Sequence, residues 1–270
     1  MNKRKILEYL VFTFLVISVF CFAFILVGGN AILAEDEAEF DAKISEIAEK
    51  YEEIKSSEDF EEELQLMENV KAKAQNLQQE YPHRSRANWE AAKAYSNYNY
   101  FANLEEDETI NVLEKGKEYA ERAIEEDPEN ARAHFWLGSI IGELGQEQGI
   151  MGSLASVDPM QEALEKAIEL DPDFAPAYDV LARLYRQAPG WPLSIGDDEE
   201  ALKYSKKSVE VAPNNSTYLW RLYEIYRELD REEKAEEVLE EILDLPETND
   251  FVREDVGEIK EKAEAELEDL

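Results

Sequence analysis

The feature that most constrains the fold is a recurring pair of amphipathic helices closed by a proline. Three segments end alike: residues 120–130 (AERAIEEDPEN), 164–174 (LEKAIELDPDF) and 205–215 (SKKSVEVAPNN). Each is followed by a second stretch with apolar residues at i, i+3 and i+4, the spacing of one helix face. Proline ends the first helix because it lacks an N–H and clashes with the preceding turn. The repetition predicts an all-α solenoid in which each helix pair packs on its neighbours.

Weaker copies of the unit end at Pro82 and Pro246, so we expect about four repeats and a leading helix. The unit resembles the tetratricopeptide (TPR) repeat, a helix A–helix B pair of 34 residues. The residues that carry the resemblance are Leu137-Gly138 and Leu181-Ala182 in helix A, and Ala123 and Ala167 in helix B. The resemblance covers roughly residues 60–246. It implies a TPR-like α-solenoid that serves as a protein-binding scaffold.

Two repeats carry extra residues between helix A and helix B. The prolines 128, 172 and 213 are 44 and 41 residues apart, against 34 in a regular repeat. The inserts are residues 145–159 and 187–198, and both are rich in Gly and Pro. They hold large apolar residues that a solvated turn does not need, namely Ile150, Met151, Leu154, Trp191 and Leu193. We expect these side chains to pack on the solenoid or on a partner.

The second insert narrows the resemblance. The stretch AYDVLARLYRQAPGWPLSIGD resembles the bacterial extracytoplasmic TPR proteins associated with TRAP transporters, the T component. The insert pattern is also similar to that of the animal regulator of microtubule dynamics proteins. The bacterial resemblance implies a solenoid that self-associates and pairs with the solute-binding protein of a TRAP system. The animal resemblance implies only the fold and the shape of the inserts.

The N-terminus predicts membrane targeting. Lys3, Arg4 and Lys5 precede residues 9–27, a run without a charge. As a helix this run would extend roughly 28 Å, close to the bilayer core of about 30 Å. Its length favours a retained anchor, whereas the small residues after it offer a cleavage site, so residues 1–34 are a signal peptide or a membrane anchor. Either way we expect an extracytoplasmic chain, periplasmic, secreted or on the outer face of the cell membrane.

Three further segments follow the targeting segment. Residues 35–58 predict a leading helix or stalk, because apolar residues recur along one helical face. Residues 59–246 predict the TPR-like solenoid. Residues 247–270 predict a polar C-terminal capping helix that covers the last repeat.

Charge and composition argue against several functions. The chain has 28 Lys plus Arg against 63 Asp plus Glu, a net charge of −35 that repels nucleic acid and anionic lipid. One Cys and two His do not make a disulfide or a Cys/His metal site. No nucleophile–base arrangement or phosphate-binding motif occurs. We therefore expect no enzymatic activity, no metal, no cofactor and no nucleic-acid partner.

In TPR proteins the side chains of helix A line a concave groove, and the resemblance implies such a groove here. The candidate groove residues are Arg86, Trp89, Lys93, Arg132, Phe135, Arg183, Arg186, Trp220 and Arg227. Basic residues outnumber acidic ones at the groove positions, unlike in the whole chain. We expect the groove to accept a carboxylate-bearing peptide or ligand through forked Arg hydrogen bonds and aromatic contacts. The alternative is that the Arg stems only pack over apolar side chains and pair with local carboxylates.

The expected function is an exported protein-interaction scaffold, an accessory subunit of a TRAP-type organic-acid uptake system. The expected partner is a TRAP solute-binding subunit or a second copy of the chain, with membrane contact through the N-terminal segment if it is retained. One alternative is a protein that binds a small organic acid or lipid. Another is a self-assembling structural protein of the cell envelope.

Overall fold

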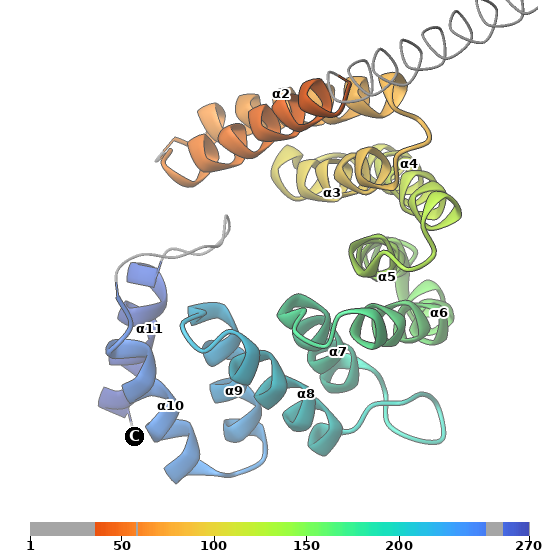
Figure 1. The fold of residues 1–270 in the computed structure, drawn as a ribbon. Coiled ribbons are helices and arrows are strands. Elements are labelled where there is room, and N and C mark those ends of the chain that lie inside the picture. The colour runs from red at the N-terminus through yellow and green to blue at the C-terminus, as the bar shows by residue number, and fades with distance from the viewer. Residues whose placement is uncertain (1–35, 58, 247–255, 270) are drawn as a thin grey trace, which may run out of the picture. The chain divides into compact units, whose positions relative to one another are not determined.

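The structure, a computed structural model, describes residues 36–57, 59–246 and 256–269. Within these ranges the regular elements are helices, apart from one isolated bridge between Gly190 and Gly196 (Figure 1). The prediction of an all-α chain is therefore confirmed for the described residues. The chain divides into two units between Ala48 and Glu49. Residues 36–55 are helical, and the unit boundary falls within this helix.

The second unit is a series of helix pairs. Its helices are α2 (Phe60–Glu80), α3 (Ser85–Ala102), α4 (Glu106–Glu126), α5 (Ala131–Glu147), α6 (Gly149–Leu170), α7 (Ala175–Gln187), α8 (Asp198–Val211), α9 (Ser216–Glu228), α10 (Glu232–Leu243) and α11 (Val256–Asp269). Each helix packs mainly on the next one along the chain (Figure 1). Helices α3, α5, α7 and α9 are the helices A of the repeats, and α4, α6, α8 and α10 are the helices B. Contacts between sequence neighbours are what a solenoid requires.

The Pro-containing motifs both end and start helices. In the sequence DPEN, Asp127 caps the end of α4 with its N–H bonded to the carbonyl of Ala123. Three residues later the Asn130 side chain accepts hydrogen bonds from the Arg132 and Ala133 N–H groups at the start of α5. An Asn at this position satisfies N–H groups that have no partner within the helix. The spacing of the motif is thus explained by two helix caps.

The predicted small residues lie at the helix crossings. Ala123 and Ala167 are fully buried, as is Leu164 of α6. A methyl group added to Gly138 of α5 would lie 3.0 Å from Leu164 Cγ, so the two helices approach too closely for a larger residue there. Side chains in a protein interior interlock at nearly the density of a crystal, so a close helix crossing accommodates only small residues.

The first insert differs from the prediction of a Gly-rich turn. Residues 149–159 are the first three turns of α6, which continues through Pro159, and the connection from α5 is Gln148 alone. Gly149 has φ +73°, a left-handed conformation that Gly adopts at little cost and that lets the chain reverse here. The extra residues therefore lengthen helix B. The second insert is non-helical, as expected, and projects between α7 and α8 (Figure 1).

The predicted targeting segment, residues 1–34, lies outside the described residues. Among the residues that the structure does describe, no helix has both the length and the apolar character needed to cross a bilayer. At the other end, α11 packs on α10 and α9, and the Tyr223 hydroxyl of α9 donates a hydrogen bond to Glu266 Oε2 at 2.5 Å.

Candidate functional site

A cavity of about 330 Å³ opens where all four helices A meet, and we call it the helix-A cavity. Its lining residues are Ser96, Asn97 and Tyr100 of α3, Phe135, Trp136, Ser139, Gly142, Glu143 and Gln146 of α5, Met160 of α6, Pro176, Asp179, Val180 and Arg183 of α7, and Thr217, Tyr218 and Arg221 of α9. The repeat brings them together because each helix A lies beside the next at the same level. Two predicted groove residues, Phe135 and Arg183, line this cavity.

Most charges in the helix-A cavity are paired. Arg221 Nε donates to Asp179 Oδ1 at 2.5 Å, and both side chains are largely buried. Ser96 Oγ donates to Glu143 Oε1 at 2.6 Å. These contacts join side chains of successive repeats. They therefore stabilise the relative positions of neighbouring helices A and also satisfy the charged groups.

Arg183 is the exception. No described side chain lies within ion-pair distance of its guanidinium, although Asp179 and Glu143 act on it at longer range. Burial lowers the pKa of Arg183, and the nearby Arg221 lowers it further. The Ser139 hydroxyl in the same cavity is buried and also has no hydrogen-bond partner among the described residues. A desolvated cation and an unsatisfied hydroxyl in one cavity leave two polar groups that a ligand can satisfy.

A second cluster of predicted groove residues surrounds a buried carboxylate, Glu90 of α3. Its Oε2 lies 4.0 Å from Lys93 Nζ, and Arg86 and Arg132 also act on it electrostatically. Burial raises the pKa of Glu90, and the three cations partly offset this. Burial lowers the pKa of Lys93, whose ammonium also lies 4.0 Å from the centre of the Tyr51 ring.

Aromatic rings hold Arg132 in this cluster. Its guanidinium lies 5.9 Å from the Trp89 ring centre and 5.5 Å from that of Phe174. Such cation–π contacts stabilise an Arg without an external ligand. Arg132 and Lys93 therefore already lie beside aromatic rings and the Glu90 carboxylate.

The remaining predicted groove residues lie apart from the helix-A cavity lining. Arg186 is held between Glu228, through Nε at 2.8 Å, and Glu224, through Nη1 at 2.6 Å. Trp220 packs against Tyr223 with ring centres 4.9 Å apart. Arg227 is exposed at the end of α9. The nine candidates therefore do not form one continuous site.

Arg221 was not among the predicted groove residues, because the groove positions of a TPR repeat fall on Thr217 and Trp220 in α9. A signal was present. Asp179 and Arg221 are the fifth and sixth residues of successive helices A, so opposite charges recur almost one repeat apart. A search for complementary charges at matching repeat positions finds this pair.

A larger cavity of about 620 Å³ lies beside the inserts, and we call it the insert cavity. Residues of the first insert and of α6 (149–160) face Leu184 to Pro189 across it. It shares Gly142, Gln146, Met160 and Arg183 with the helix-A cavity, so the two cavities adjoin. Neither Met151 nor Trp191 lines it.

Four of the five predicted apolar insert residues are exposed, whereas Leu154 is half-buried. The exposed fractions are 82% for Ile150, 77% for Met151, 89% for Trp191 and 76% for Leu193. The first of the two predicted arrangements, packing on the solenoid, is therefore wrong for these four side chains, because Ile150 and Met151 lie on an exposed face of α6 and Trp191 and Leu193 lie in the loop between α7 and α8. The second predicted arrangement, packing on a partner, stays a prediction.

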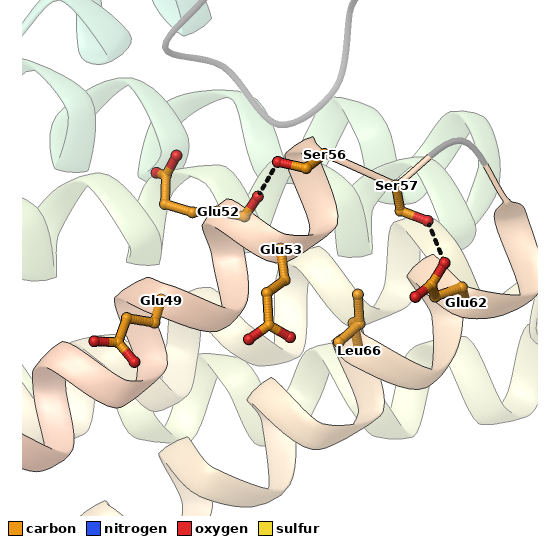
Figure 2. Close-up of a pocket in the computed structure, with 7 residues that line it drawn as sticks. All are labelled: Glu49, Glu52, Glu53, Ser56, Ser57, Glu62 and Leu66. Carbon is orange, nitrogen blue, oxygen red and sulfur yellow. Dashed lines mark hydrogen bonds between the residues drawn. The ribbon is translucent and has the colours of Figure 1, made fainter.

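Figure 2 shows a third hollow, between residues 49–57 and the start of α2. Carboxylates dominate it, and Glu52, Glu53 and Glu62 have local partners. Lys55 Nζ lies 2.8 Å from Glu52 Oε1, and Ser57 Oγ donates to Glu62 Oε2 at 3.2 Å. In the part of the chain that the structure describes, no group of three or more His, Cys, Asp or Glu is arranged to hold a metal ion. This hollow has the character of a solvated acidic surface.

Comparison with known proteins gives a family match. The profile of the family described as Regulator of microtubule dynamics protein 1-3 matches residues 41–188. Regulator of microtubule dynamics protein 1 of Rattus norvegicus is 30% identical over 139 residues, which cover 47% of this chain and 45% of the relative. Regulator of microtubule dynamics protein 3 of Mus musculus is 29% identical over 195 residues, which cover 66% of this chain and 40% of the relative. The chain thus spans less than half the length of these relatives.

Solved structures agree on the fold. A thermophilic TPR protein of Thermus thermophilus superposes with a TM-score of 0.58 at 12% identity, covering 76% of this chain and 92% of that one. The pilF protein of Pseudomonas aeruginosa superposes with a TM-score of 0.55 at 15% identity, covering 86% of this chain and 89% of that one. The prediction of a TPR-like solenoid is confirmed.

The prediction of an extracytoplasmic location is wrong, because the relatives that match include regulator of microtubule dynamics proteins of rat and mouse. The physical reason is that a basic stretch before an apolar run indicates attachment to some membrane without specifying which one. Of the two resemblances drawn from the insert pattern, the one to the regulator of microtubule dynamics proteins is confirmed.

Proposed function

Because this chain belongs to the Regulator of microtubule dynamics protein 1-3 family, we propose that it is a protein-interaction scaffold whose helix-A cavity binds a carboxylate-bearing segment of a partner. The observation that carries the proposal is Arg183, a desolvated cation in that cavity without an ion-pair partner among the described side chains. A role in microtubule dynamics comes from the names of the relatives and is part of the proposal.

The chemistry of the cavity favours a carboxylate. An Arg guanidinium forms two parallel hydrogen bonds to a carboxylate, and these charge-assisted bonds are stronger in a desolvated site. Ser139 offers a further hydroxyl to the same ligand. Phe135 and Trp136 are in edge-to-face contact at 5.0 Å and provide an apolar wall. Because four repeats contribute lining residues, an extended segment can contact several of them at once.

The proposal includes no catalytic step. Among the described residues that line the helix-A cavity there is no nucleophile–base pair, and the carboxylates are engaged with Arg221 and Ser96. The apolar run at residues 9–27 is proposed to attach the chain to a membrane. A role as a TRAP accessory subunit required the exported location, so we do not carry it forward.

The test is charge reversal at Arg183 alone. Arg186 is unsuitable because it is already held between Glu224 and Glu228. Wild-type protein and Arg183→Glu are applied to an array of short peptides with and without Asp, Glu or a free C-terminus. The control is Lys207→Glu on the opposite helix of the repeat, where Lys207 pairs with Glu210.

We expect acid-bearing peptides to lose at least ~10-fold in affinity with Arg183→Glu, because a charge that repels the carboxylate replaces a half-buried cation that attracts it. Lys207→Glu should leave binding unchanged. Equal binding by the wild type and Arg183→Glu, with unchanged circular dichroism, would refute the proposal.

The insert cavity favours a second candidate function, the binding of a small organic acid or lipid. Its lining is mainly apolar, and Arg183 supplies a cation on the wall that it shares with the helix-A cavity. Native mass spectrometry of the purified protein distinguishes this function, because a bound small molecule adds a defined mass that Arg183→Glu removes.

A further inference from the structure

The two inserts are exceptional in charge as well as in length. Residues 148–157 (QGIMGSLASV) and 187–196 (QAPGWPLSIG) contain no Asp, Glu, Lys or Arg, in a chain that is 34% charged. The two runs lie in successive repeats and come from different kinds of structure, one a helix and the other a loop. Both runs therefore contribute an uncharged surface, which we call the insert surface.

The fold brings both runs to the insert cavity. Residues from Gly149 to Val157 form one side, and Gln187 to Pro189 form another. Trp191 and Leu193 follow within a few residues of Pro189, and Ile150 is itself a lining residue. Of the exposed apolar side chains, Ile150 lines the insert cavity, and Met151, Trp191 and Leu193 belong to the two segments that form its walls.

We propose that the insert surface is a docking site for a basic amphipathic helix of a partner protein. This inference goes beyond the proposed function, since its anchors are the insert side chains and its ligand is basic, although the insert cavity shares Arg183 with the helix-A cavity. Exposed aromatic and aliphatic side chains beside a cavity are typical of the anchors that dominate protein interfaces. A large apolar side chain of the partner would enter the insert cavity while Trp191 and Ile150 cover it.

The charge of the partner follows from what borders the insert surface. Glu147 and Asp158 flank the first run, Asp197 and Asp198 follow the second, and all four are exposed. Arg186, which precedes the second run, is paired with Glu224 and Glu228. Lys or Arg at the flanks of a partner helix would face these carboxylates. The net charge of −35 also accelerates association with a basic partner at low ionic strength.

The same acids disfavour two other occupants. A second copy of the chain would bring identical carboxylates and another charge of −35 toward this surface. A membrane with anionic lipids would be repelled for the same reason. Charge complementarity therefore selects the basic helix.

The test uses a fluorescein-labelled helical peptide with Leu on one face and Lys on the other, followed by anisotropy at about 0.15 M salt. A second peptide carries Glu in place of every Lys. The full chain is compared with Ile150→Ser/Trp191→Ser and, as a matched loss of an exposed ring elsewhere, Phe60→Ser. Met151→Ser/Leu193→Ser provides an independent variant of the same surface.

We expect the Leu/Lys peptide to bind at least ~10-fold more weakly to both insert variants and normally to Phe60→Ser. The Leu/Glu peptide should not bind. Wild-type affinity in the insert variants would overturn the proposal, as would equal binding of the two peptides. Binding of the chain to phosphatidylcholine vesicles would also overturn the proposal if the insert substitutions abolish that binding. A dimer in sedimentation velocity would overturn it in the same way if the insert substitutions abolish the dimer.

Discussion

The crossing of α5 and α6 contains two glycines one helical turn apart, and a methyl group would meet different atoms at each. At Gly138, an added Cβ would lie 3.0 Å from Leu164 Cγ and 3.2 Å from the Met160 carbonyl oxygen. Leu164 is fully buried, so its branch carbon has no room to move away. At Gly142, the nearest atoms are Met160 Sδ at 2.8 Å and Cε at 3.0 Å, the flexible end of a side chain.

These contacts predict opposite effects for the same substitution. Replacing Gly by Ala inside a helix gains about 1 kcal/mol from helix propensity at either position. At Gly138 this gain is opposed by overpacking against fixed atoms, which costs about 1–3 kcal/mol. At Gly142 the thioether can rotate away, so most of the propensity gain remains. Gly142→Ala should therefore be more stable than Gly138→Ala by about 1–3 kcal/mol.

The assay is urea unfolding followed by circular dichroism, with both variants and the wild type measured in the same buffer. Gly138→Ala should unfold at a lower urea concentration than the wild type, and Gly142→Ala at an equal or higher one. The two substitutions share a helix and a partner helix, so each controls for the other. A Gly138→Ala protein as stable as Gly142→Ala would refute the packing argument.

Three further predictions concern single side chains. Burial raises the pKa of the Glu90 carboxyl, so the folded protein binds the carboxyl proton more tightly than the unfolded chain does. The contribution of Glu90 to the free energy of unfolding is therefore highest at low pH and falls as the pH rises through the raised pKa. Glu90→Gln should therefore gain stability relative to the wild type between pH 4.5 and neutrality, measured by urea unfolding across that range, and a constant difference would contradict it. Asp179→Asn leaves Arg221 without its carboxylate and should cost about 1.5–3 kcal/mol, with a smaller loss in the double variant Asp179→Asn/Arg221→Met. Leu164→Ala removes a fully buried side chain and should cost about 2–5 kcal/mol in the same assay, and an unchanged midpoint would contradict the assigned core.

The candidate site was only partly predictable. Phe135 and Arg183 were selected from repeat positions, and both line the helix-A cavity. Arg186 was selected by the same rule but is neutralised by Glu224 and Glu228 of the next repeat. A position in a repeat tells which way a side chain points, whereas its availability depends on side chains about one repeat away in sequence.

Local rules let the sequence determine the helical repeat. Proline, Asn caps and apolar spacing act within one or two turns, so segments such as DPEN define where helices end and begin without reference to the rest of the chain. The lack of charge in the inserts is also a local property, because it can be read from the residues of each insert alone.

The tertiary structure decided which of these local features are used. The first insert became a longer α6, since Gly149 reverses the chain and residues 149–159 continue as helix despite Pro159. Packing left the insert side chains uncovered and left Arg183 without a described ion-pair partner. The burial and the ion pairs of a side chain depend on residues that folding brings together from distant parts of the chain. A single segment of the sequence therefore does not determine them.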